Sequence, residues 1–209
     1  MRSEQNWADR MVLWVARHWL ALFGAAWGLY VIMPLLAPLF MHWGWVAPAR
    51  YIYAAYSYAC HQLPDHSYFL FGKSLTPSLH DLEGMGLQPG LGLLEQRKFI
   101  GSTEAGYKVA ICERDVAIYG AIFLAGLVFA LFRHRRWQLS WQLFVLLTLP
   151  IAIDGGTQLL GLHQSNWWLR TITGALFGIA SVLFAYPIVD GAMQEIAGTS
   201  TRIKPISHN

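Results

Sequence analysis

The sequence predicts an all-α membrane protein with four transmembrane helices. Of its 209 residues, 55% are hydrophobic and only 13% are charged, and the apolar residues form long segments. A soluble domain carries charge on about a quarter of its residues, so fifteen basic and twelve acidic side chains are too few to cover a globule of this length. The basic residues form no long stripe, and nucleic acid is therefore not an expected partner.

Four segments approach the length of about 20 apolar residues that a helix needs to cross a bilayer. They are residues 19–42, 116–132, 141–162 and 167–189. Tryptophan rings prefer the level of the lipid headgroups, and six tryptophans lie near the ends of these segments. These are Trp19, Trp43, Trp45, Trp141, Trp167 and Trp168.

Basic side chains cluster before the first span, between the second and third spans, and after the fourth span. They are Arg2, Arg10, Arg17, Arg133, Arg135, Arg136, Arg202 and Lys204. Four spans bring these three segments to one side of the membrane, and an excess of Lys and Arg marks the cytoplasmic side. We therefore expect a single integral domain, residues 1–209, in the plasma (inner) membrane of a prokaryote. Both termini are expected in the cytoplasm, with residues 43–112 as a long outer loop.

The outer loop is expected to contain two small structures. Residues 51–60 are apolar but too short to span a membrane, and they include four tyrosines, which favours an interfacial helix. Residues 98–111 contain two β-prone runs around a Ser-Thr-Glu-Ala-Gly turn, which predicts a β-hairpin. Residues 76–92 are rich in Gly and Pro and predict an irregular loop.

Glycine pairs with the spacing G-x-x-x-G occur in the first and fourth spans. They are Gly24 with Gly28 and Gly174 with Gly178. In lipid this spacing allows two helix backbones to approach closely. The glycines therefore predict either packing among the four helices or docking onto a larger membrane assembly.

Polar and ionisable residues gather at the predicted outer ends of the spans. A charge within hydrocarbon costs at least ~2.5 kcal/mol, so such groups are expected to face inward and pair. We expect Arg114 or Arg170 to meet Asp154 or Asp115. The resulting network either ties helix ends together or surrounds a small cavity for a ligand, a proton or an ion. The candidate residues are Cys60, His61, Gln62, Cys112, Arg114, Asp115, Asp154, Gln158, Ser165, Asn166 and Arg170.

The two cysteines, Cys60 and Cys112, are both expected on the outer side. An oxidising exterior favours a disulfide between them, which is the leading interpretation. A second interpretation is a metal site formed by Cys60, His61, Cys112 and Asp115, since a mixed set of S, N and O ligands can hold zinc. No C-x-x-C pair supports the metal site. The third interpretation is two free buried thiols.

Three stretches of the sequence carry a resemblance to a known family. They are CHQLPDHSYFLFG from Cys60, CERDVAIYGA from Cys112, and DGGTQLLGLHQSNWWLRTITGALFG from Asp154. In this order they resemble a family of small prokaryotic multi-pass membrane proteins classed as a domain of unknown function. That family shows C-H-Q/R-x-P-x-R-S, then C-x-R-C before I-Y-x-G, then D-G-x-x-Q followed by S-N-x-x-R-x-x-T-G.

Two positions depart from the family pattern. His66 stands where the family usually has Arg, and Asp115 stands where it usually has a second Cys. The resemblance implies that the polar positions form a site, but it implies no activity. The altered cysteine pattern favours a chain that keeps the scaffold and has lost or changed its chemistry.

The expected function is a non-catalytic accessory or structural subunit of a larger membrane complex, preferably a respiratory or photosynthetic electron-transfer complex. The small four-helix body, the many aromatic residues and the absence of haem, iron–sulfur and nucleotide motifs favour this hypothesis. No cofactor is expected, and the expected partners are the lipid bilayer and other membrane subunits. The alternative is a membrane enzyme or transporter that uses the outer cluster of Cys, His, Asp and Arg on a small molecule or metal.

Overall fold

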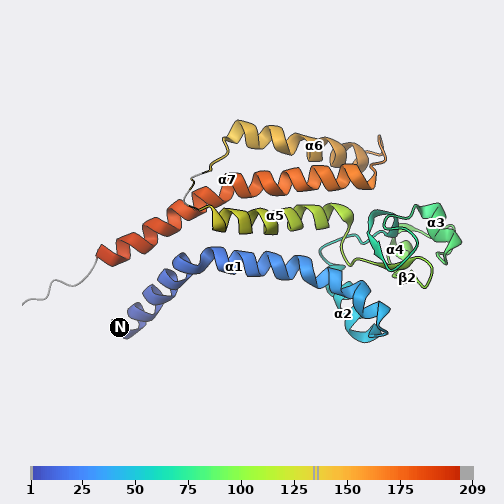
Figure 1. Cartoon of the computed structure of the whole chain (residues 1–209), viewed down its shortest axis with the longest axis horizontal. Coiled ribbons are helices and arrows are strands. Elements are labelled where there is room, and N and C mark those ends of the chain that lie inside the picture. The colour runs from blue at the N-terminus through green and yellow to red at the C-terminus, as the bar shows by residue number, and fades with distance from the viewer. Residues whose placement is uncertain (1, 134, 136, 203–209) are drawn as a thin grey trace, which may run out of the picture.

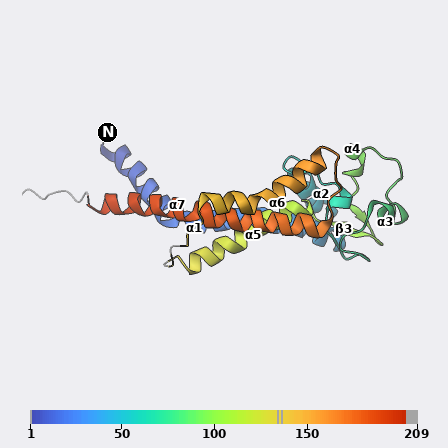
Figure 2. The same ribbon diagram turned by 90° about the horizontal axis from the view of Figure 1, so that it is seen from above.

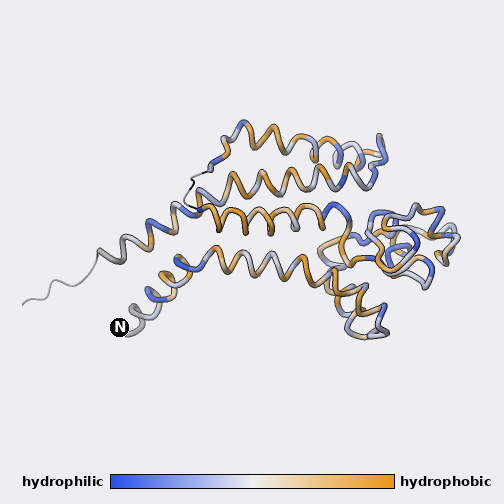
Figure 3. The backbone as a smooth tube through the Cα atoms, viewed as in Figure 1, coloured by the Kyte–Doolittle hydropathy of each residue, from blue (hydrophilic) through white to orange (hydrophobic). Residues whose placement is uncertain are grey.

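A computed structural model describes residues 2–133, 135 and 137–202, and most of them are helical (Figure 1). The four long helices are α1 (Arg2–His42), α5 (Glu113–Leu131), α6 (Trp141–Leu159) and α7 (Trp167–Arg202). Each contains a segment long and apolar enough to cross a membrane, which agrees with the predicted spans. Apolar residues dominate the middle of the bundle (Figure 3). Arg136 and Lys204, two of the predicted cytoplasmic basic residues, lie outside the described residues.

The four helices lie roughly along one direction, and α5 packs against both α1 and α7 (Figures 1 and 2). Helix α6 packs on α7. The start of α1 and the end of α7 lie at the same end of the bundle, which we call the terminal end (Figure 1). Residues 43–112 lie at the opposite end, which we call the loop end (Figure 1).

Three helix boundaries differ from the sequence prediction. Helix α1 begins 17 residues before the predicted first span, and α7 continues to Arg202 instead of ending near residue 189. Because α1 is longer, Trp19 lies within the helix and packs inside the bundle, with only 2% of its surface exposed; its position at the level of the lipid headgroups stays a prediction. Helix α6 ends at Leu159, because Gly161 takes a φ of +70° and turns the chain.

Two prolines in α1 leave carbonyl groups that other segments use. A proline has no N–H, so the carbonyl four residues earlier in the helix has no partner from its own helix. Pro34 frees the carbonyl of Tyr30, which accepts a hydrogen bond from the Tyr56 hydroxyl at 2.9 Å. Pro38 frees the carbonyl of Pro34, which accepts from the Ala110 backbone N–H at 3.3 Å. Both bonds attach the loop-end segment to α1.

The loop end contains seven short elements. They are α2 (Val46–Tyr56), η1 (Pro64–His66), β1 (Phe69–Leu70), α3 (Leu79–Gly84), α4 (Leu93–Gln96), β2 (Gly101–Ser102) and β3 (Gly106–Lys108). The strands form an antiparallel sheet in the order β1-β3-β2, with Phe69 opposite Lys108 and Gly101 opposite Tyr107. The predicted hairpin is confirmed as β2 and β3. Its turn requires Gly106, whose φ is +75°.

Two other predictions for this segment have different outcomes. A helix is present near residues 51–60, as α2, but its position at the membrane interface stays a prediction. Residues 76–92 are not wholly irregular, because they include α3. Ser78 caps this helix by accepting from the Asp81 backbone N–H at 3.2 Å, while the Asp81 carboxylate accepts from the Ser78 backbone N–H at 2.9 Å.

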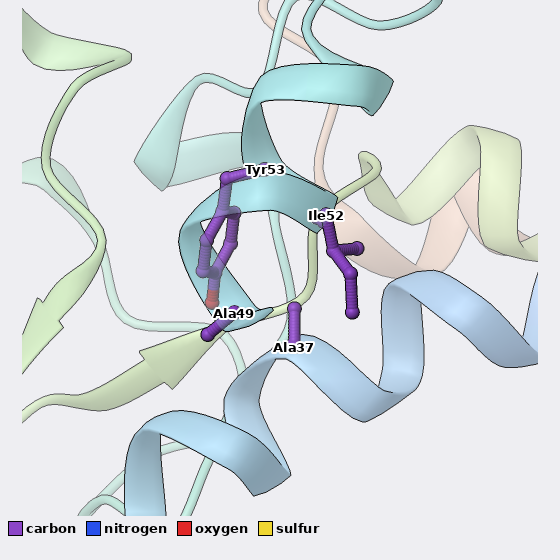
Figure 4. Close-up of a cluster of buried hydrophobic side chains, with 5 residues drawn as sticks. Ala37, Ala49, Ile52 and Tyr53 are labelled. Atoms are coloured by element: carbon purple, nitrogen blue, oxygen red, sulfur yellow. The ribbon is translucent and has the colours of Figure 1, made fainter. Parts of the chain in front are cut away.

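The interior of the loop end combines an apolar cluster with buried polar side chains. Ala37 of α1 packs against Ala49, Ile52 and Tyr53 of α2 (Figure 4). The Tyr53 hydroxyl then donates to the Lys108 carbonyl at 2.5 Å.

Lys108 is fully buried and bonds the two chain segments beside it. Its Nζ donates to the carbonyls of Gln62 at 2.7 Å and Arg97 at 2.6 Å. Burial, and next the nearby Arg97, lower the pKa of Lys108 to about 7. Since each carbonyl belongs to a different loop segment, Lys108 fixes how these segments fold together.

A second polar cluster joins the helices at the terminal end. Asp190 of α7, which is 6% exposed, pairs with Arg133, just after α5. It also accepts hydrogen bonds from Trp19 Nε1 at 3.2 Å and Gln194 Nε2 at 2.7 Å. The carboxylate therefore has partners from α1, the end of α5 and α7, and this arrangement serves to tie the helices together.

The glycine pairs pack as predicted in α7 but only in part in α1. A Cβ at Gly174 would lie 3.0 Å from Ala117 Cβ, and one at Gly178 would lie 2.4 Å from the Ile118 carbonyl oxygen of α5. A Cβ at Gly28 would meet the Phe123 ring at 2.9 Å, whereas Gly24 faces open space. The close approach of α5 and α7 thus depends on glycine.

We predict that Gly178→Ala destabilises the bundle and that Gly191→Ala, on the same helix, does not. The new methyl group at position 178 meets backbone atoms that cannot move independently, and overpacking costs ~1–3 kcal/mol. A Cβ at Gly191 meets nothing within 4 Å. Unfolding by increasing fractions of SDS in detergent micelles measures the difference. Equal stability of the two variants would contradict the packing described above.

We predict that Tyr56→Phe destabilises the loop end by ~1–3 kcal/mol, because the Tyr30 carbonyl loses its donor and stays unsatisfied. Tyr51→Phe is the matched control, since Tyr51 is 78% exposed. Hydrogen exchange of residues 46–112, measured by mass spectrometry, reports local stability. Unchanged exchange in Tyr56→Phe would show that this hydrogen bond does not hold the segment.

Candidate metal site

A pocket of about 220 Å³ opens at the loop end, close to where α5, α6 and α7 begin or end. Seven of the predicted candidates line it, together with two further residues. The lining residues are Ala59, Cys60, His61, His66, Cys112, Arg114, Asp115, Gln158 and Arg170. Residues from the loop and from three helices thus meet in one place, and we call this place the loop-end pocket.

The two cysteines are close together but not bonded. Both are free and buried, so the predicted disulfide is not formed. A disulfide requires its sulfurs to lie about 2.05 Å apart. Instead, the Cys60 sulfur accepts a hydrogen bond from the Cys112 backbone N–H at 3.1 Å. The arrangement keeps two buried cysteines side by side on the wall of the pocket.

Three of the four residues in the alternative metal prediction come together. The ligand atoms of Cys60, His61 and Cys112 all lie within 4.8 Å of one another, and no other group of this kind occurs among the described residues. A tetrahedral zinc ion with bonds of ~2.1–2.3 Å holds its ligand atoms about 3.5–3.8 Å apart. Shifts of about 1 Å would therefore close this set around a metal. Asp115 lines the pocket but does not belong to this group.

His61 is held in place and is neutral at physiological pH. The Leu63 backbone N–H donates to His61 Nδ1 at 3.1 Å, and the ring contacts the His66 ring edge-on at 5.6 Å. The side chain is exposed at its edge, yet the protein atoms around it exclude enough water to lower its pKa. Neutral imidazole is the form that binds metals.

The thiol of Cys112 keeps its proton in the absence of a ligand. A hydrogen bond to Cys60 and burial raise the pKa of Cys112 well above its ordinary value. A metal ion that binds here must displace this proton, as it does at most thiolate sites. Binding is therefore expected to release protons.

Arg114 of α5 is fixed by two side chains of α6. Its Nη2 lies 2.5 Å from Asp154 Oδ2 and 3.1 Å from Gln158 Oε1. Only 3% of the Asp154 side chain is exposed. A side chain at Gly155 would approach Arg114 Nη1 at 3.3 Å, so the glycine after Asp154 leaves room for the guanidinium. One of the predicted arginine–acid pairs is therefore present.

Arg170 of α7 has a different partner from those predicted. Its Nη1 lies 3.1 Å from Glu113 Oε2, and its Nη2 donates to the Ser165 carbonyl at 2.5 Å. The Arg170 and Glu113 side chains are 7% and 1% exposed. The pair joins the start of α5 to the start of α7. Within the part of the chain that the structure describes, Arg170 forms no ion pair with Asp154 or Asp115.

Four candidates do not line the pocket, and one of them, Asp154, holds Arg114 as described above. Gln62 has a φ of +52° and donates through Nε2 to the carbonyls of Tyr53 and Ala110 at 2.9 and 2.8 Å, so it joins α2 to the segment after β3. Asn166 caps α7 by accepting from the Leu169 backbone N–H at 3.0 Å. Ser165 supplies only its carbonyl to Arg170. These residues position the site.

His66 and Glu113 belong to this region but were not among the candidates. His66 Nε2 lies 3.6 Å from Asp65 Oδ2 and 3.5 Å from Gln158 Nε2. Burial lowers the pKa of His66 to about 4, so the ring is neutral at physiological pH. Both residues lie within the motif stretches of the sequence. The sequence signal that could have identified these two residues is their position near the predicted candidates in the same motifs.

Comparisons with known proteins agree with a membrane protein. Residues 96–184 match the family described as predicted membrane protein (DUF2085). The uncharacterized protein MJ1492 of Methanocaldococcus jannaschii is 27% identical over 168 residues, which cover 77% of this chain and 85% of that protein. No solved structure matches the chain. Together with four helices long and apolar enough to span a bilayer, these similarities identify a multi-pass membrane protein.

The ion pair between Arg114 and Asp154 makes a specific prediction. In a double-mutant cycle of Arg114→Gln and Asp154→Asn, we expect a coupling free energy of ~1–3 kcal/mol, because each substitution alone leaves a buried partner unpaired. The control pair is Lys73 and Glu104, whose side chains are 71% and 58% exposed. Its coupling should stay below ~0.5 kcal/mol. Additive effects of Arg114→Gln and Asp154→Asn on SDS unfolding would exclude the contact.

Proposed function

We propose that this multi-pass membrane protein binds a thiophilic metal ion of the zinc type in the loop-end pocket. The observation that carries the proposal is the meeting of Cys60, His61 and Cys112, whose ligand atoms lie within 4.8 Å of one another. Two thiolates and one imidazole are ligands that zinc readily accepts. The cysteines are separated by more than fifty residues in the sequence, so only the folded chain assembles this set.

The residues around the three metal-donor atoms favour a zinc site that binds a further ligand over a zinc site that only stabilises the fold. Structural zinc sites are closed by four protein ligands, whereas sites that act on a ligand have three and keep one position open. The three donors here lie on the wall of a pocket that is also lined by Arg114, Asp115 and Gln158. These features favour the alternative function predicted from the sequence, in which the chain uses this cluster to act on a small molecule or a metal.

The orientation of the protein in the membrane is inferred from the positions of its basic residues. Arg133 and Arg135 lie in the connection between α5 and α6, at the end of the bundle that also holds the start of α1. We infer that this terminal end faces the cytoplasm of a prokaryote and that the loop-end pocket faces outward across the plasma membrane. Labelling of a Tyr58→Cys variant, in which the new thiol replaces a side chain that is 95% exposed at the loop end, by a membrane-impermeant reagent in intact cells tests this orientation.

The accessory-subunit hypothesis stays a prediction, and its electron-transfer part has no supporting observation among the described residues. What favours other membrane subunits is the surface of α6, which packs on α7 and leaves a row of large apolar side chains exposed. These are Leu143, Leu146, Leu149 and Ile153. Lipid tails would cover these apolar side chains equally well.

We predict that the purified, reduced protein binds one Zn²⁺ or Co²⁺ per chain. Cys60→Ser and Cys112→Ser should each weaken binding at least ~100-fold, since loss of a ligand costs more than loss of its supporting partners. His80→Ala and His163→Ala are matched controls, because both histidines are exposed and lie outside the pocket. Thiolate-to-Co²⁺ absorption and metal analysis measure binding. Wild-type affinity in both serine variants would overturn the proposal.

A further inference from the structure

The loop-end pocket offers more than three metal ligands. Asp115, Arg114 and Arg170 line it together with the cysteines, and its volume of about 220 Å³ is that of a small molecule with a few waters. A tetrahedral metal held by Cys60, His61 and Cys112 keeps its fourth coordination position open, because the described residues offer three ligands in this group. Whatever binds there also lies against the three charged residues.

Two hydrogen-bond donors beside the pocket have no acceptor. Among the described residues, Arg114 and Arg170 each have a buried Nε without a partner, although their Nη atoms are bonded. The Arg170 side chain is only 7% exposed, so water does not compensate readily. An unsatisfied buried donor of a charged group is costly. Both Nε atoms are shielded from the pocket, so a ligand that carries two or more acceptor oxygens removes this cost when the two guanidinium groups turn toward it.

One acceptor in the same pocket is also free. The Asp115 carboxylate forms no ion pair within the part of the chain that the structure describes, and it lines the pocket with the two arginines. A carboxylate accepts hydrogen bonds but donates none when it is ionised. The pocket therefore matches a ligand that accepts from two guanidinium groups and donates an O–H to Asp115.

We propose that the loop-end pocket binds a small oxyanion that retains a hydroxyl group, of the class of hydrogen phosphate or bicarbonate. This proposal rests on the proposed metal site, because one oxygen of the anion fills the open position of the metal. The other oxygens accept from Arg114 and Arg170, and the hydroxyl donates to Asp115. Arginine is suited to this task, since its planar fork matches the oxygens of phosphate and carboxylate.

The charges of the pocket are compatible with a hydroxylated oxyanion. A divalent metal with two thiolates is neutral, and Arg114 and Arg170 are each balanced by one carboxylate, Asp154 and Glu113. Asp115 then remains as the negative group on the pocket wall. It repels an anion that cannot donate to it and bonds to one that can. Phosphate should therefore be preferred over sulfate, which has the same shape but no O–H at neutral pH.

The experiment uses the full-length protein in detergent, loaded with one Co²⁺ per chain at pH 7. Inorganic phosphate and sulfate are titrated separately, and the Co²⁺ absorption bands and the ³¹P linewidth report binding. We expect phosphate to shift the bands and to bind at least tenfold more tightly than sulfate. Arg114→Lys keeps the positive charge beside Asp154 and removes the Nε donor, so it should weaken phosphate binding. Arg50→Lys, at an exposed position outside this pocket, is the matched control.

A second variant tests the role of Asp115 without changing the size of the side chain. Asp115→Asn should retain Co²⁺ and bind phosphate and sulfate with similar affinity, because an amide both donates and accepts. Vesicles that contain phosphatidic acid, whose headgroup also has a P–OH, distinguish the source of the anion. A response to inorganic phosphate assigns the free ion, whereas a response to these vesicles alone assigns a lipid headgroup.

The outcomes separate the two proposals. If Co²⁺ fails to bind in a Cys60- and Cys112-dependent way, the metal function itself is wrong. If Co²⁺ binds and neither phosphate nor phosphatidic acid alters its spectrum, the metal site stands and the anion site is wrong. Equal affinity for phosphate and sulfate in the unsubstituted protein would overturn the selection of a hydroxylated oxyanion by Asp115.

Discussion

The candidate site depends on two carbonyl groups that prolines leave free in α1. A carbonyl at membrane depth must find a donor within the protein, and those of Tyr30 and Pro34 find the Tyr56 hydroxyl and the Ala110 N–H. Cys60 follows Tyr56 by four residues, and Cys112 follows Ala110 by two. The bonds that attach the loop end to α1 therefore also bring both sulfurs to the same place. Pro187 of α7 repeats the principle, since the freed Leu183 carbonyl accepts from Leu139 N–H at 3.1 Å.

Two buried ion pairs fix the opposite wall of the pocket. One joins α5 to α6 and the other joins α5 to α7, through the neighbouring residues Arg114 and Glu113. Such pairs contribute little net stability, because desolvation offsets most of their attraction. Their value lies in geometry, since each guanidinium is held by its Nη atoms while its Nε stays unpartnered. The wall is thus rigid and polar, which suits a site that recognises a small ligand.

The predictability of the structure differs between local and long-range features. The four spans and the hairpin follow from local signals, which are continuous apolar segments and a turn between β-prone runs. The partner of Arg170 could not be predicted in this way. Asp115 and Glu113 are two residues apart on α5 and face different directions, so only the packing angle of α5 on α7 selects Glu113.

The sequence by itself determined the class of protein, the number of apolar helices and the end of the bundle at which the polar residues collect. Hydropathy and residue spacing are sufficient for these features, because each depends on one helix at a time. The tertiary structure alone decided that Cys60 and Cys112 are adjacent thiols without a disulfide and that His61 joins them. The physical reason is that distances between side chains from separate segments depend on the docking of the loop on α1, which no local pattern encodes.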